Sequence, residues 1–329
     1  MSEGRGHPVA IRADMKAARR LEWWNIFWTC TYVAALGVAM GGSQAMKTAW
    51  VEDILGLIPP IAFLVAERYE RRSANKRFHY GYDRVNGLGF FVAAVALSAV
   101  GLLLLWDAAA VLVAREHVTV GTTRIMGHDV WLGWFMIAAQ AYACIPPFII
   151  GRKELKLATR LRDKLIHTDA LMNKANWQTG LAGIVGVALL GFGFWWGDAV
   201  AAAIISASII LDGWRALKVA IAELNDGVPH ELEGGNRAKD AKAVEKALKA
   251  MFPGAKVLLR ETGRYIRAEV VGAEPRKGFS PDELEIEGLD APWRLDSVAF
   301  RPCKHFPTGT RLAYRRCNSP LRKSPTRRK

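Results

Sequence analysis

The hydrophobic residues of the chain gather into six long runs, at roughly 23–41, 46–66, 85–106, 130–150, 170–196 and 198–217. Each run has about the 20 residues that a helix needs to cross the hydrocarbon core of a bilayer. Apolar helices of soluble proteins carry polar residues every three or four positions, whereas Gly89–Trp106 contains only Ser98. The pattern therefore predicts six membrane-spanning helices.

The residues after the last run have the pattern of a small soluble domain. Lys239–Met251 has a helical period, Lys256–Glu261 and Arg264–Val271 have the pattern of a β-hairpin, and Leu295–Arg301 has that of a last strand. We therefore expect an α-helical membrane protein followed by a small α+β cytoplasmic domain. The predicted parts are a cytoplasmic N-terminal segment (1–22), a six-helix membrane domain (23–217), a linker (218–238), an α+β domain (239–302) and a disordered basic tail (303–329).

Charge refines this organisation. The chain has a net charge of +14, and residues 301–329 contain ten Lys and Arg residues and no acid. Such a concentrated excess argues against a nucleic-acid-binding fold, and the tail is suited to contact anionic membrane lipid. Basic residues also cluster at 5–20, 68–84 and 152–164, on one side of the runs, against Lys47, Arg115 and Arg124 on the other. The positive-inside rule then predicts a multi-pass protein of the cytoplasmic (inner) membrane with both termini in the cytoplasm.

Ionisable and polar residues inside the runs are candidates for function, because they are costly in a membrane unless they are paired. The second run contains Glu52 and Asp53. The fifth run opens with four residues spaced as one helical face, namely Asp169, Met172, Asn173 and Asn176. Their oxygens and the thioether could hold a divalent cation together with Glu52. The alternative is a hydrogen bond between Glu52 and Asn176 with no ion.

Several local motifs resemble those of one transporter family, the cation diffusion facilitators. The motifs are Gly42–Ala45 before the second run, Arg77–Arg84 before the third, Asp169-Ala170-Leu171 in the fifth, Asp198 before the sixth, Ala222–Pro229 after it, and the hairpin segment Arg260–Tyr265. The resemblance implies a homodimeric exchanger of divalent metal ions for protons with a ferredoxin-like cytoplasmic domain, here shortened in its second helix. It implies no enzyme activity and no tightly bound cofactor.

The chain departs from this family at the transport site, where the resemblance expects two ligands from the second helix and two from the fifth. Glu52 and Gly56 fall on the first pair, and Met172 and Asn176 on the second, so one position lacks a ligand. A site completed by Asp53, Asp169 or water would suit Mn²⁺, Fe²⁺ or Mg²⁺, while Met172 favours softer ions such as Zn²⁺ or Co²⁺. The choice of metal stays open.

Two further roles follow from the resemblance. Proton coupling is expected at Glu52 or Asp169, with His167 as a relay near the cytoplasmic mouth. His79 in the loop before the third run is a weaker candidate for a second metal site. The leading hypothesis is efflux of a divalent cation by proton antiport. The alternative is a relative that has lost transport and acts as a heteromeric partner or a metal sensor.

Overall fold

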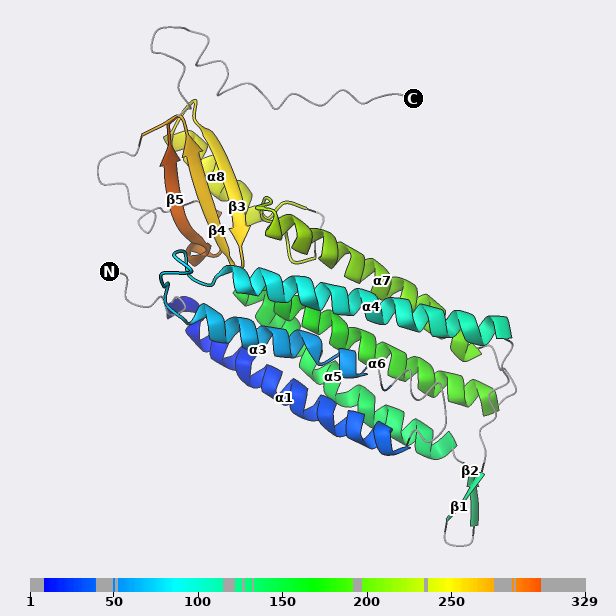
Figure 1. The fold of residues 1–329 in the computed structure, drawn as a ribbon. Coiled ribbons are helices and arrows are strands. Elements are labelled where there is room, and N and C mark those ends of the chain that lie inside the picture. The colour runs from blue at the N-terminus through cyan, green and yellow to red at the C-terminus, as the bar shows by residue number, and fades with distance from the viewer. Residues whose placement is uncertain are drawn as a thin grey trace, which may run out of the picture.

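The computed structural model describes residues 9–39, 50, 53–114, 122–125, 128–131, 133–191, 197–233, 236–274, 286 and 288–302. Six long or medium helices form a bundle, and a small sheet with one helix lies beyond one end of it (Figure 1). The bundle helices are α1 (Val9–Ala39), α3 (Ile58–Glu70), α4 (Arg84–Ala114), α5 (Gly133–Leu161), α6 (Lys164–Gly191) and α7 (Gly197–Leu224). A two-stranded hairpin, β1 (Thr122–Ile125) and β2 (His128–Trp131), lies at the opposite end.

The bundle helices agree in position with the six apolar runs but extend past them. α1, α4, α5, α6 and α7 each have 28 to 31 residues, which corresponds to about 42–46 Å of helix. Within the described part of the chain, α4 is the one helix that qualifies to span a membrane by length and apolar composition alone. The others carry charged residues along their ends, so six spans remain a prediction.

The second apolar run does not form one continuous helix in the described residues. A short helical piece at 53–55 is followed by a turn at Gly56 and Leu57, after which α3 begins. Pro59 and Pro60 lie in the first turn of α3, where a missing backbone N–H removes no intrahelical bond. Pro146 and Pro147, by contrast, lie inside α5. The turn at Gly56 therefore sets where α3 starts.

The bundle core is built from small and medium apolar side chains, so that the helices approach closely. One buried cluster draws on all six helices and includes Met15, Phe63, Phe90, Leu161, Ile166 and Val219. α4 packs tightly on α7, where a Cβ at Gly213 would meet Ser98 Oγ at 2.7 Å and its backbone nitrogen at 3.0 Å. The absence of a side chain at Gly213 is what permits this approach.

The soluble unit has the predicted α+β character. It consists of α8 (Lys239–Met251), β3 (Lys256–Thr262), β4 (Tyr265–Val271), a 3₁₀ turn (Pro292–Arg294) and β5 (Leu295–Arg301). β3 pairs with β4 antiparallel and β4 with β5 parallel, in the order β3-β4-β5. α8 packs on the sheet through Val244 and Leu248, both fully buried in an apolar core. The expected shortened second helix falls in the stretch between β4 and β5, most of which lies outside the described residues.

Two predicted boundaries change. The linker expected at 218–238 begins later, because α7 continues to Leu224. The N-terminal segment expected at 1–22 is helical from Val9, as the start of α1. In both places the helix continues beyond the apolar run. The basic tail at 303–329 lies outside the described residues.

Candidate functional site: buried polar groups along α6

The structure brings together two of the four transport-site positions. A Cβ built on Gly56 would lie 3.2 Å from Nδ2 of Asn176 and 3.1 Å from the backbone oxygen of Asp53. The Asn176 amide therefore already occupies the space that a side chain at position 56 would need. Oδ1 of Asn176 is buried and has no hydrogen-bond partner among the described residues. A buried acceptor of this kind is rare in folded proteins and points to a missing donor or cation.

Met172 lies among apolar side chains. It is 1% exposed and belongs to a cluster with Ala96, Leu97 and Val100 of α4 and Ile209 of α7. Leu55 and Ile58, which flank the Gly56 turn, pack against the same cluster. Glu52, the fourth position, lies outside the described residues.

Asp169 turns toward different helices. Its carboxylate lies with Glu22 of α1 and Glu154 of α5, each offering an oxygen within 4.8 Å of the others. All three side chains are buried, with exposed fractions of 0%, 0% and 1% for Glu22, Glu154 and Asp169. We call these three residues the carboxylate cluster. It is the one group of three or more potential metal ligands that the described part of the chain contains.

Two asparagines hold the carboxylate cluster together. Asn25 Nδ2 donates to Glu154 Oε1 at 3.2 Å and to Asp169 Oδ2 at 3.3 Å, and Asn173 Nδ2 donates to Glu154 Oε2 at 2.9 Å. The face predicted on the fifth helix therefore divides in two. Asp169 and Asn173 contact α1 and α5, whereas Met172 and Asn176 face α3 and α4.

The other predicted candidates lie apart from one another. His167 is 8% exposed in the first turn of α6. Lys174, a basic residue within the fifth apolar run, lies 3.5 Å from Asp212 of α7 and pairs with it. Asp53 is partly buried, and its own backbone oxygen lies 3.1 Å from the place that a Cβ on Gly56 would take. These positions give no second cluster of ligands.

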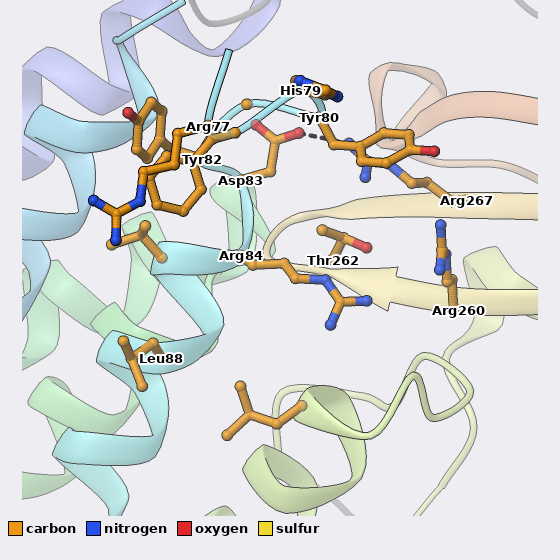
Figure 2. A pocket seen from close by; sticks show the side chains of 14 residues that line it. Arg77, His79, Tyr80, Tyr82, Asp83, Arg84, Leu88, Arg260, Thr262 and Arg267 are labelled. Carbon is orange, nitrogen blue, oxygen red and sulfur yellow. Dashed lines mark hydrogen bonds and ion pairs between the residues drawn. The ribbon is translucent and has the colours of Figure 1, made fainter. Parts of the chain in front are cut away.

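His79 lies in the loop between α3 and α4, exposed beside a cavity of about 740 Å³. Figure 2 shows this cavity between the loop, the start of α4 and the strands β3 and β4. Its charged lining is mainly cationic, with Arg77, Arg84, Arg260 and Arg267. Within the described residues, His79 belongs to no group of three metal ligands. The cationic lining disfavours a metal ion here.

A network of buried ion pairs joins the bundle to the sheet. Arg264, which precedes β4 and is 0% exposed, donates from Nη1 to Glu70 of α3 at 2.5 Å and from Nε to Asp163 at 2.6 Å. Asp163 also caps α6, because its Oδ1 accepts the N–H groups of Leu165 and Ile166 at 2.8 and 3.2 Å. We call this set of contacts between the bundle end and the sheet the junction.

A second part of the junction surrounds Lys164, the first residue of α6. Lys164 pairs with Glu223 of α7 at 3.4 Å and with Glu261 of β3, and Glu261 also accepts from Arg294 at 3.0 Å. Burial, opposed by the cations, raises the pKa of Glu70 to about 7 and that of Glu223 to about 7. Arg264, between two carboxylates, has a pKa raised above its ordinary value despite its burial.

Comparison with known proteins identifies the bundle. Residues 25–225 match the family model described as the cation efflux transmembrane domain. The chain belongs to the cation efflux family, that of the cation diffusion facilitators. Two relatives are a zinc transporter ZitB from Yersinia pseudotuberculosis serotype I (strain IP32953) and one from Yersinia pestis, each 25% identical over 227 residues that cover 69% of this chain and 69% of the relative.

Membership of the cation efflux family confirms the resemblance that the motifs indicated. The family consists of membrane transporters, in agreement with the expectation that the chain is not an enzyme. Sequence reasoning found Asp169, Asn173 and Asn176 through their spacing, but it missed Glu22 and Glu154. Both had been assigned to flanking segments outside the apolar runs. The available signal was weak: each acid lies within one helical turn of an apolar run, on a helix that continues past it.

Proposed function

We propose that this cation efflux protein exports a divalent metal ion from the cytoplasm across the cytoplasmic membrane in exchange for protons. Family membership carries the proposal, since the matched model runs from Asn25, within α1, to the end of α7. The family relatives printed as zinc transporters support a divalent ion as the substrate. The protein works as a homodimer with both termini in the cytoplasm, and the start of α1 and the soluble unit lie at the same end of the bundle (Figure 1).

The proposed transport position lies where the Gly56 turn meets α6. Its support is the buried Oδ1 of Asn176, an oxygen ligand with no partner among the described residues. In this proposal Glu52 supplies the carboxylate, and Met172 and Asp53 are the further candidate ligands. Because oxygen ligands dominate, the position favours Mn²⁺, Fe²⁺ or Mg²⁺ over Zn²⁺ or Co²⁺. Protons leave and enter through Glu52 or Asp169, with His167 between the site and the cytoplasm.

The alternative, a non-transporting partner or sensor, has one specific observation in its favour. Position 56 has no ligand, and its neighbour Asn176 leaves no room for one without moving. Such a protein keeps the bundle and the junction while the ion path is closed. This alternative predicts that Glu52→Ala leaves cellular metal tolerance unchanged but disrupts a complex with another membrane protein.

Reconstituted vesicles separate the two. The full-length protein is placed in liposomes that enclose a pH-sensitive dye, and gradients of Mn²⁺, Zn²⁺, Fe²⁺, Co²⁺ or Mg²⁺ are applied. We expect metal-driven pH changes, and Asn176→Ala should slow them about tenfold or more, as loss of a metal-site residue does. Gln178→Ala, which removes an amide on the same helix about 200° away, is the matched control and should transport normally.

The proposed function is wrong if folded protein gives no pH change with any of the five ions. Equal slowing by Asn176→Ala and Gln178→Ala would indicate damage to α6 rather than loss of a ligand. A metal flux without a pH change would support the transport part of the proposal and refute the proton coupling.

A further inference from the structure

The carboxylate cluster differs from every other buried acid group at the cytoplasmic half of the bundle. Glu22, Glu154 and Asp169 come from three helices and bring three carboxylates together in a space that water does not reach. No ion pair between described residues includes any of the three. No amide, hydroxyl or cationic group of the described residues donates to either oxygen of Glu22, whose side chain is 0% exposed. Its hydrogen bond is with the carboxyl of Asp169 and requires a proton shared between the two acids.

The junction supplies the comparison. There each buried acid faces a buried cation: Glu70 and Asp163 face Arg264, and Glu223 and Glu261 face Lys164. Carboxylates removed from water are costly unless a positive charge compensates them. In the carboxylate cluster the neighbouring donors are neutral amides, which satisfy some lone pairs but bring no charge. Either protons or a cation from outside the chain must therefore compensate the three carboxylates.

We propose that the carboxylate cluster is a second binding site for the divalent cation, distinct from the position between Gly56 and Asn176. Three carboxylates supply at least three oxygen ligands, which hard divalent ions such as Mn²⁺ and Mg²⁺ prefer. Half a turn of the Asn25 amide would replace Nδ2 by Oδ1 and add a fourth oxygen. Asn173 holds Glu154 in place through a 2.9 Å hydrogen bond and acts as a positioning residue.

The location of this site gives it a role in transport, and that role rests on the proposed function. Asp169 and Asn176 lie on the same stripe of α6, seven residues or about 10 Å apart along the axis. Asp169 is the nearer of the two to the soluble unit. The carboxylate cluster is therefore a staging site, which an ion from the cytoplasm occupies before it reaches the transport position. The cluster is closed in this conformation, so loading requires α1 or α5 to move.

Binding of Mn²⁺ to the full-length protein in detergent tests the site, because free and bound Mn²⁺ differ in their electron paramagnetic resonance signal. We expect Glu22→Gln and Glu154→Gln each to weaken one class of Mn²⁺ sites at least tenfold. Glu67→Gln is the matched control: Glu67 is also a buried helical acid, but it pairs with Arg71 at 2.6 Å. Asn176→Ala should keep the staging site while it loses transport.

Thermal stability gives a second measurement that does not depend on transport. Neutralising one of three crowded carboxylates should raise the melting temperature of metal-free Glu22→Gln above that of the natural protein. Mn²⁺ should then raise the melting temperature of the natural protein more than that of the variant. A variant that failed to fold would contradict the proposal, because it would show that the charge of Glu22 is needed without metal.

The outcomes separate this proposal from the proposed function. Unchanged Mn²⁺ binding in both glutamine variants would overturn the staging site, whatever the vesicles show. Absence of any Mn²⁺ binding, with proton uptake lost in the variants, would also overturn it and leave a proton site alone. Normal binding with no flux in vesicles would remove the staging role and the proposed function but leave the binding site.

Discussion

Among the described residues of the junction, Arg264 is the one whose loss should destabilise the contact between bundle and sheet the most. Its guanidinium is 0% exposed and lies 2.5 Å from Glu70 and 2.6 Å from Asp163, whose side chains are 3% and 0% exposed. In Arg264→Met the volume is nearly kept, but two buried carboxylates lose their cationic partner, and Asp163 keeps only its neutral hydrogen-bond donors. Removing one member of such a buried pair costs about 3–5 kcal/mol of stability.

The loss should depend on pH in a definite direction. Without Arg264, the cation that opposes the effect of burial is gone, so the pKa of Glu70 rises above its value of about 7. A raised pKa in the folded state favours folding at low pH and disfavours it as pH increases through the folded pKa. Arg264→Met should therefore be more damaging at pH 8 than at pH 5.5. Adding Glu70→Gln should recover part of the loss at pH 8.

Equilibrium unfolding of the detergent-solubilised protein, followed by tryptophan fluorescence, measures these effects. Arg301→Met is the control, because Arg301 pairs with Glu269 at 2.8 Å but is half exposed. An exposed pair of this type contributes at most about 1 kcal/mol. If Arg264→Met costs no more than Arg301→Met, or if its cost is the same at both pH values, the assignment of the junction as a buried ion-pair network is wrong.

Two further predictions concern other parts of the bundle. Burial raises the pKa of Glu223 from 4.5 to about 7. Its contribution to stability should therefore be full below about pH 4.5 and lost by about pH 7, a change of at most about 3 kcal/mol. The Glu223→Gln variant should flatten this part of a pH–stability profile. Gly213→Ala should cost about 1–3 kcal/mol in the same unfolding assay, since its Cβ would meet Ser98 Oγ at 2.7 Å; an unchanged stability would show that α4 and α7 can separate freely.

The sequence predicted the elements better than their ends. The apolar run at 85–106 became α4, and the predicted hairpin formed with its turn one residue later than expected, at Gly263 and Arg264, because apolar periodicity and turn residues act locally. The ends moved outward: α5 reaches Leu161 and α7 reaches Leu224. Helical hydrogen bonding does not stop where the hydrophobic run stops, so a hydropathy pattern marks the membrane core rather than the helix.

The candidate site shows the same limit more sharply. Spacing alone placed Asp169 and Asn176 on one face of a helix, and they are on one stripe. Which helices that stripe meets depends on packing between distant segments, and it changes within two turns. Glu22 and Glu154 were not singled out, because a sequence cannot show which side of an amphipathic helix end turns inward. The carboxylate cluster could be identified only from the three-dimensional structure.

Asp163 has a consequence for how the two parts of the protein communicate. One carboxylate caps α6, accepts a hydrogen bond from Asn86 of α4 at 3.2 Å and holds Arg264 beside the sheet. A tilt of α6 by the passing ion must displace this carboxylate, and the sheet is tied to it through a rigid guanidinium. The soluble unit is then expected to move with α6 about Asp163, which lies about 20 Å along the helix from Asn176. In the proposed homodimer, one fluorophore would be attached to β5 of one protomer and a second to α8 of its partner. Energy transfer between them would report the position of α6 without any change to the proposed ion path.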